Sequence, residues 1–140
     1  MRNLLAASLL LTGCLGSGGN VTLSVSMAMG VSPSVTGYSA TNATAVADGA
    51  GVVHFTATSS DGELTLLIQG PLSQGQMPDL MSEHNNMSLD VMGAGWASNG
   101  GVIAVDGVSP YKLRFISVPM LAGSGDAKGS FVIDGAGTFD

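Results

Sequence analysis

Apolar and polar residues alternate along residues 21–29, where every odd position is apolar and every even position is small or polar. A period of two is typical of a β-strand with one buried face. The pattern places Met27 and Met29 on that buried face together with Val21 and Leu23. The segment therefore predicts a half-buried strand.

Other short runs of β-branched and aliphatic residues have a similar character. Residues 102–105 are apolar on both faces, which is typical of a central strand. In residues 111–115, the two aromatic side chains and the leucine are expected to point inward and the two cations outward. The expected strands are residues 21–29, 35–40, 52–58, 64–69, 87–91, 102–105, 111–115 and 131–133.

Turn signals separate these runs. Asp61-Gly62 lies between two alternating segments, a pattern that predicts a hairpin of residues 52–58 with residues 64–69. Asp-Gly pairs also begin at Asp48, Asp106 and Asp134, where further turns are expected. Seven or eight short strands joined in this way predict one all-β domain, a single antiparallel β-sandwich, with a small β-barrel as the alternative.

The composition supports a folded β-protein and excludes one class of partner. Only 10% of the 140 residues are charged, against roughly 25% in ordinary soluble proteins, and 45% are hydrophobic, so intrinsic disorder is not expected. The formal net charge is −6, with four lysine and arginine residues that form no cluster. Because nucleic-acid binding needs clustered cations to displace counterions from phosphates, we expect no nucleic-acid partner.

The N-terminus is built like an export signal. Arg2 precedes an apolar run at residues 4–11, which is long enough for a signal segment but too short to span a bilayer. The run ends in Leu11-Thr12-Gly13-Cys14, and Cys14 is the only cysteine in the chain. This sequence resembles the lipobox of bacterial lipoproteins, a leucine and two small residues before the cysteine that becomes the mature N-terminus.

The resemblance implies a domain organisation and a location. Residues 1–13 would be a cleaved signal peptide, residues 14–20 a lipidated Cys14 and a flexible glycine-rich tether, and residues 21–140 the β-domain. Acyl chains on Cys14, such as palmitate, would anchor the protein to the lipid bilayer of the cell envelope. No aspartate of the kind that retains many such lipoproteins in the inner membrane stands next to Cys14, which favours the outer membrane.

Residues 70–86 form the longest irregular segment, and such segments are often functional. Met77, Met81 and His84 would share one face if the segment were helical, and a helical turn is conceivable at residues 78–83. Thioether and imidazole ligands suit Cu(I), so these residues are a speculative metal site. The alternative is that the methionines pack the segment onto the domain.

No arrangement of residues indicates catalysis. The chain has no G-x-S-x-G motif, and nothing near His54 in the sequence couples it to a nucleophile. We therefore expect a protein that is not an enzyme and that needs no cofactor. Trp96, the only tryptophan, is a speculative carbohydrate-binding residue, since an exposed ring stacks on a sugar; a core position is the alternative.

These observations together predict a membrane-anchored envelope lipoprotein with a non-catalytic β-sandwich and a binding or structural role in an assembly. The expected partners are the bilayer and an unidentified envelope protein or glycan. The alternative functions are carbohydrate binding through Trp96 and copper binding through Met77, Met81 and His84.

Overall fold

The computed structural model describes residues 18–81 and 83–140. Cys14, the expected signal peptide and most of the expected tether lie outside these residues. The described residues form nine β-strands: β1 (Gly19–Ser32), β2 (Gly37–Ala47), β3 (Val52–Thr58), β4 (Gly62–Gln69), β5 (Asn86–Val91), β6 (Ala94–Ser98), β7 (Val102–Val108), β8 (Tyr111–Ser124) and β9 (Lys128–Phe139). None of them forms a helix long and apolar enough to cross a membrane.

All strand pairs are antiparallel, and the sheet closes on itself. Its order is β6-β5-β4-β3-β2-β1-β9-β8-β7, and a further pairing joins β6 to β8. Every strand except β7 is therefore part of a closed eight-stranded barrel. The all-β antiparallel class is confirmed, whereas the expected sandwich is wrong and the barrel, its alternative, is found.

The long strand β8 explains why the barrel closes. Its first half pairs with β7, where Phe115 lies opposite Ile103, and its second half pairs with β6, where Ala122 lies opposite Trp96. The same edge of β8 thus pairs first with β7 and then with β6. A short sequence run, residues 111–115, predicted only the first of these halves.

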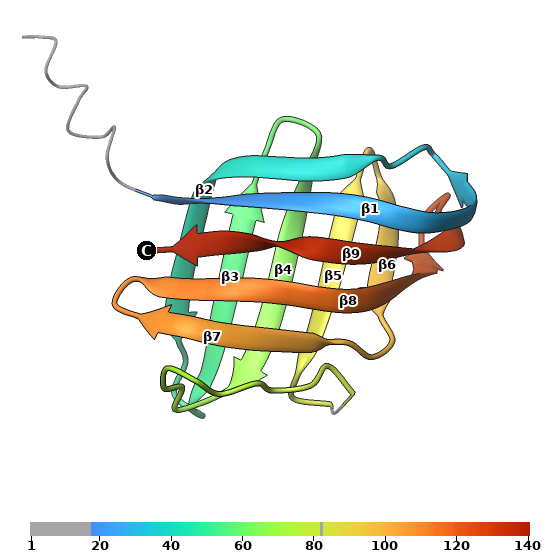
Figure 1. The fold of residues 1–140 in the computed structure, drawn as a ribbon. Coiled ribbons are helices and arrows are strands. Elements are labelled where there is room, and N and C mark those ends of the chain that lie inside the picture. Colours follow the sequence, from blue (N-terminus) through green and yellow to red (C-terminus); the bar gives the residue numbers. More distant parts are fainter. Residues whose placement is uncertain (1–17, 82) are drawn as a thin grey trace, which may run out of the picture.

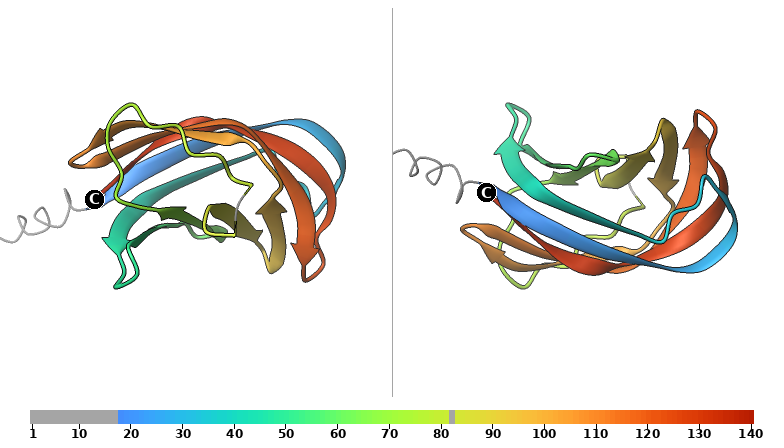
Figure 2. Two further views of the ribbon diagram at one scale, coloured as in Figure 1. Left: turned by 90° about the horizontal axis from the view of Figure 1, so that it is seen from below. Right: turned by 90° about the horizontal axis from the view of Figure 1, so that it is seen from above.

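The barrel is flattened, which explains its resemblance to a sandwich. Strands β1, β9, β8 and β7 form a front layer, and β3 to β6 cross behind them steeply (Figure 1). Strand β2 begins in the front layer and bends into the back layer. The two views along the layers show that both layers of the sheet curve around one interior (Figure 2).

Large apolar side chains fill this interior. Phe55 from the back layer makes edge-to-face contacts with Tyr111 and Phe139 of the front layer, with ring centroids 5.2 and 5.1 Å apart. Trp96 contacts Phe131 in the same way at 5.4 Å. Full burial of such a side chain stabilises the fold by about 1.5–3 kcal/mol. The barrel therefore has a packed core.

Several sequence expectations about the strands are confirmed. Strand β3 coincides with residues 52–58, and it pairs with β4 as an antiparallel hairpin across Asp61-Gly62. In β8, Leu113 and Phe115 point inward, and the cations beside them are exposed. Residues 102–105 lie in β7 and are buried on both faces at Ile103 and Ala104, but β7 is the last strand in the sheet order, so the central position that this pattern predicted is wrong.

The alternation of β1 fails in its second half. Val21 and Leu23 are buried as expected, but Met27 and Met29 are 75% and 71% exposed. Met27 has a φ of 50°, and the register with β9 shifts between Ser26 and Met29. A β-bulge inserts one extra residue, so the side chains beyond it change face. The expectation that both methionines are buried is wrong for this reason.

Two of the four expected Asp-Gly turns are also wrong. Asp48 and Asp61 lie in turns, whereas Asp106 and Asp134 lie inside β7 and β9. The Asp134 carboxylate accepts a 2.9 Å hydrogen bond from the amide of Ser117, a β8 residue at φ 47°. At this position the aspartate stabilises a bulge in the neighbouring strand rather than a turn of its own.

Residues 70–81 cross the open edge of β7 as an extended strap. The strap and β7 exchange backbone hydrogen bonds. The Gly75 amide donates to the carbonyl of Val105, the Val105 amide to the carbonyl of Gln76, and the Ile103 amide to the carbonyl of Pro78. Backbone groups at a sheet edge need such partners when they are shielded from water. The strap therefore completes the pairing of the one strand outside the barrel.

Candidate functional site

Trp96 is part of the core and forms no surface platform. It lies on β6 opposite Leu89 of β5, points into the barrel and is 1% exposed. Its indole Nε1 is buried and has no hydrogen-bond partner among the described residues. Because sugar stacking needs an exposed ring, the carbohydrate interpretation of Trp96 is a wrong prediction and the core alternative is found.

The methionine segment does not adopt the geometry that the copper hypothesis needs. The strap is extended where it pairs with β7, and residues 78–81 contain turns and a bridge but no helical turn. Met77 and Met81 are 59% and 70% exposed, and the near neighbour of the His84 ring is Glu83 at 3.5 Å. The shared helical face is therefore not formed in residues 77–81.

The alternative, in which the methionines pack this segment onto the domain, does not describe Met77 and Met81 either, because both are exposed. The buried side chain that attaches the strap to the domain is Leu80, supported by the partly buried Leu72. Met87 is buried as well, but it belongs to β5 and faces the barrel interior. Leucine side chains therefore make the contacts that the sequence pattern assigned to Met77 and Met81.

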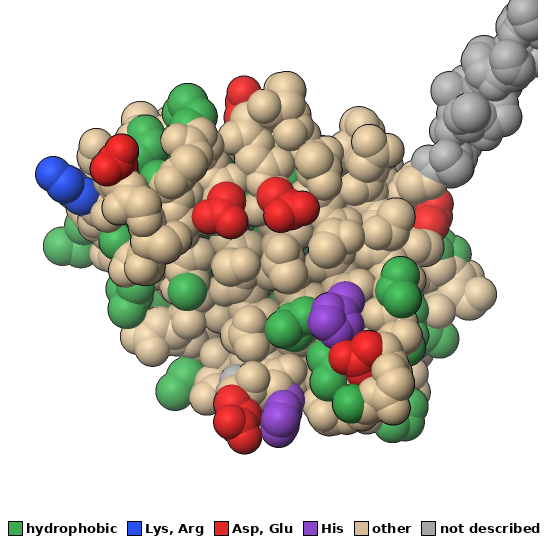
Figure 3. All heavy atoms as spheres, turned by 180° about the vertical axis from the view of Figure 1, so that it is seen from behind, with side chains coloured by type: hydrophobic (Ala, Val, Ile, Leu, Met, Phe, Trp, Pro, Cys, Tyr) green, Lys and Arg blue, Asp and Glu red, His purple; other side chains and the backbone are tan. Residues whose placement is uncertain are grey.

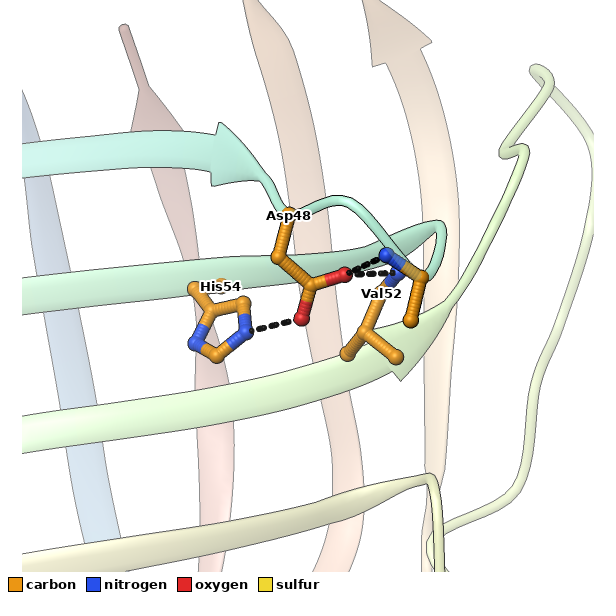
Figure 4. Close-up of polar contacts among 4 residues, drawn as sticks. Asp48, Val52 and His54 are labelled. Atoms are coloured by element: carbon orange, nitrogen blue, oxygen red, sulfur yellow. Dashed lines mark hydrogen bonds and ion pairs between the residues drawn. The ribbon is translucent and has the colours of Figure 1, made fainter.

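His54 and Asp48 form a polar contact at the turn between β2 and β3. The His54 Nε2 lies 2.8 Å from Asp48 Oδ2, and Asp48 Oδ1 accepts hydrogen bonds from the amides of Ala50 and Val52 (Figure 4). The hydrogen bond from His54, followed by those from the amides, lowers the pKa of Asp48 below its ordinary value. Asp48 thus fixes both the turn and the histidine ring.

A catalytic role for this pair would need a nucleophile in contact with the ring. Within residues 18–81 and 83–140, the one side-chain hydrogen bond of His54 is that with Asp48. The hydroxyl of Thr56, two residues along β3, is paired with that of Thr44 at 3.0 Å. The geometry is thus that of a turn stabilised by an exposed hydrogen bond, not that of an acyl-transfer triad.

An ion pair lies on the front layer, beside a shallow groove of about 460 Å³ over β1, β9 and β8. Arg114 donates two hydrogen bonds to Asp106, at 2.6 and 3.1 Å. The guanidinium lowers the pKa of Asp106, and the carboxylate raises that of Arg114. Because Asp106 neutralises Arg114, Lys112 is the unneutralised cation that lines the groove, and one lysine gives the groove little positive charge.

A cleft of about 370 Å³ opens at the end of the barrel where residues 34–39, 59–61 and 91–92 meet. Serine and threonine hydroxyls and Asp61 line it. The hydroxyl of Tyr38, also in the lining, lies 2.8 Å from the carbonyl of Ala57 and donates inward. Burial raises the pKa of Tyr38. The cleft is polar but presents no charged cluster or exposed aromatic ring that would select a ligand.

The most unusual surface is the second half of β1, residues 25–32, which we call the β1 overhang. Strand β2 pairs with β1 only as far as Ser24, so the overhang is paired with β9 on one side alone. Residues 26–30 are exposed on both faces of the strand. Figure 3 shows hydrophobic side chains at this end of the molecule, farthest from the start of β1.

One feature of the sequence points to this surface, although the apolar–polar alternation of residues 21–29 predicted a buried face there instead. No charged residue occurs between positions 15 and 47, although charges normally protect the exposed edges of sheets. Comparison with protein-family models, with curated proteins and with solved structures finds no match for the chain. A function is therefore inferred from the fold and its surfaces.

Proposed function

We propose that this protein is a lipid-anchored, non-catalytic lipoprotein of the cell envelope, more specifically of the outer membrane, whose β-barrel displays the β1 overhang as a docking strand for assembly. One observation carries the proposal: the exposed apolar residues lie in the second half of β1, and the candidate anchor precedes the first half by five residues along the chain. Anchoring at one end leaves the other accessible to a partner.

The position of Cys14 supports the anchoring half of the proposal. Strand β1 begins at Gly19, five residues after Cys14, so a tether of at most roughly 17 Å separates the acylated residue from the barrel. Two or more acyl chains give stable attachment because each buried CH₂ contributes about 0.8 kcal/mol. The barrel would then lie close to the membrane surface.

The β1 overhang supports the docking half. Met27 and Met29 are largely exposed, and Leu121 of β8 lies on the same outer row as Met29, separated from it by Ser130 of β9. Methionine is common at binding surfaces because its unbranched, polarizable side chain adapts to a partner. Exposed apolar side chains that gather on one surface are typical of a site where another protein docks.

The absence of catalysis is supported by how the chemically versatile groups are used. Asp48 and His54 stabilise a turn, Asp106 neutralises Arg114, and Asp134 stabilises the bulge at Ser117. Each of these groups has a structural role that its contacts explain. We therefore assign no substrate and no cofactor to the protein.

The anchoring half is tested by labelling the full chain with an alkyne analogue of palmitate in a bacterial host and separating membranes from soluble protein. Wild type should incorporate the label and sediment with membranes, and Cys14→Ala should do neither. Ser17→Ala, in the same segment, is the matched control and should behave as wild type. Equal labelling or sedimentation of Cys14→Ala would contradict the anchor.

A further inference from the structure

The groove on the front layer begins at the start of β1, because Asn20 is one of its lining residues. Thr138 of β9 pairs with Asn20 on one side and with Lys112 of β8 on the other. Adjacent strands are about 4.8 Å apart, so the backbone of Lys112 lies about 10 Å from that of Asn20. Asn20 follows Cys14 by six residues. An anchor at Cys14 would therefore hold this groove close to the lipid headgroups.

We propose that the groove is the membrane-facing surface of the barrel and that the headgroup of an anionic phospholipid occupies it. In this arrangement Lys112 contacts the lipid phosphate, and Asn20, Thr22 and Thr138 offer amide and hydroxyl donors from the same lining. The inference rests on the proposed lipid anchor. It adds the orientation of the barrel and the class of lipid that the barrel contacts.

The shape of the groove leaves room for a headgroup. Thr22 of β1, Ala136 of β9 and Arg114 of β8 form one row across the sheet, and the smallest of the three side chains is in the middle. Ala136 is exposed, and the groove has a volume of about 460 Å³. A headgroup can therefore approach β9 between the longer side chains of the two neighbouring strands.

Charge is divided unequally between the two layers of the barrel. The basic side chains of the described residues, Lys112, Arg114 and Lys128, all lie on β8 and β9 of the front layer. Strands β3 to β6 contain no lysine or arginine, and Glu63 of β4 lies directly opposite Asp90 of β5. Acidic side chains are visible across this back face (Figure 3). An anionic membrane repels the back layer, so the front layer is the side that approaches it.

The acidic residues at this end of the barrel leave the charge of Lys112 in place. Asp106 accepts two hydrogen bonds from Arg114 and neutralises it. The amide of Asp140 donates to the carbonyl of Ala43 in β2, which lies on the other side of β1 from the groove. The groove thus keeps one positive charge at the end of the barrel that the tether holds nearest to the membrane.

The anchor explains how a single lysine has an effect. An exposed lysine attracts a free anion only weakly. An acylated chain is confined to the membrane, however, so headgroups surround the groove at a high effective concentration. Near an anionic surface, one lysine then favours the bound orientation by about five-fold. The groove therefore orients the barrel on the membrane and does not retain free phosphate.

Amine footprinting of the acylated full-length chain tests the contact without any substitution. Lys112 and Lys128 are the two lysines of the chain, both are exposed, and they lie at opposite ends of the β8–β9 pair. The chain is reconstituted into vesicles of phosphatidylcholine, or of phosphatidylcholine and phosphatidylglycerol in equal parts, and treated with a water-soluble acetylating reagent. By mass spectrometry, the ratio of Lys112 to Lys128 acetylation should be about five-fold lower in the anionic vesicles.

A charge variant tests whether the groove itself causes this protection. Ala136→Glu adds a carboxylate to the middle of the groove, which repels the headgroup, so the acetylation ratio should be the same in both kinds of vesicle. Ala97→Glu adds the same charge at an exposed position of β6 in the back layer and should retain the wild-type difference. Trp96 fluorescence and thermal unfolding should be unchanged in both variants, which shows that the barrel remains folded.

Three results would overturn the inference in a chain whose intact mass shows acylation. They are a wild-type ratio that is equal in neutral and anionic vesicles, a five-fold difference that persists in Ala136→Glu, and equal protection of Lys112 when inorganic phosphate is added to neutral vesicles. Each would leave the anchor intact and remove the lipid contact of the groove. A chain that carries no acyl group would contradict the anchor, and this inference with it.

Discussion

Phe55 connects the two layers of the flattened barrel, and its truncation tests whether the interior is packed. The side chain is fully buried on β3 and contacts the rings of Tyr111 and Phe139 on the front layer, with interplanar angles of 86° and 74°. Phe55→Ala removes both contacts and leaves a void where the two layers meet.

The expected loss follows from these contacts. Removing a buried phenylalanine costs about 3–5 kcal/mol, and each edge-to-face pair accounts for about 0.5–1.5 kcal/mol beyond its area. A domain of this size has a free energy of unfolding of about 5–15 kcal/mol, so the variant loses a large fraction of it. The melting temperature should fall by roughly 10 °C or more.

Urea unfolding followed by fluorescence provides the assay, since Trp96 is the only tryptophan and is buried. Val46→Ala, at an exposed position on the neighbouring strand, is the control and should change the free energy of unfolding by less than about 0.5 kcal/mol. A Phe55→Ala midpoint equal to that of the control would refute the packed interior and indicate an open one.

Further predictions concern single residues. His54→Val should raise the pKa of Asp48 toward its ordinary value in an NMR titration, because the largest cause of its lowering is removed; an unchanged pKa would contradict the contact. Since folding lowers this pKa, the stabilisation by Asp48 is present above its unfolded-state pKa and is lost as pH falls through the folded-state pKa. Gly101→Ala should lower the free energy of unfolding by about 1–3 kcal/mol, because φ is 89° and the added Cβ would lie 2.6 Å from a backbone atom of β8. Gly49→Ala, where a Cβ meets nothing within 4 Å, should be nearly neutral, and equal effects in urea unfolding would refute the steric argument. Peroxide should oxidise the exposed methionines before the buried ones, as peptide mass mapping can show; prior oxidation of a buried one would contradict the fold. The exposed set is Met27, Met29, Met77, Met81 and Met92, and the buried set is Met87 and Met120.

The sequence predicted elements whose neighbours along the chain determine them. Strands β3 and β4 alternate regularly and a turn signal lies between them, so local information is enough to predict the hairpin, although its two central residues are Ser60 and Asp61 rather than Asp61 and Gly62. The inward face of residues 111–115 followed for the same reason. Local periodicity fails where a distant strand decides the outcome.

Three failures have such a non-local cause. The burial of Met27 was wrong because a bulge opposite β9 changes the face of the strand. Asp106 resembles a turn residue, but its partner Arg114 lies on the adjacent strand. The sandwich prediction failed because barrel closure depends on the second half of β8 pairing with β6, and neither segment has a strong sequence signal.

The candidate site was less accessible to sequence reasoning than the fold. Trp96 and the methionine segment attracted attention because their residue types are chemically distinctive, yet Trp96 is in the core and the segment is extended. The overhang consists of ordinary residues, and its interest lies in their exposure. That exposure depends on where the pairing of β2 with β1 ends, which no local pattern encodes.

The intact mass of the full chain, expressed in a bacterial host with and without an inhibitor of lipoprotein signal peptidase, tests the proposed function most directly. A diacylated or triacylated chain that begins at Cys14 is expected, together with an uncleaved precursor that accumulates under the inhibitor. An unmodified chain that retains Met1 in both conditions would contradict the anchor, and the exposed strand would then belong to a protein that is not held at a membrane by Cys14.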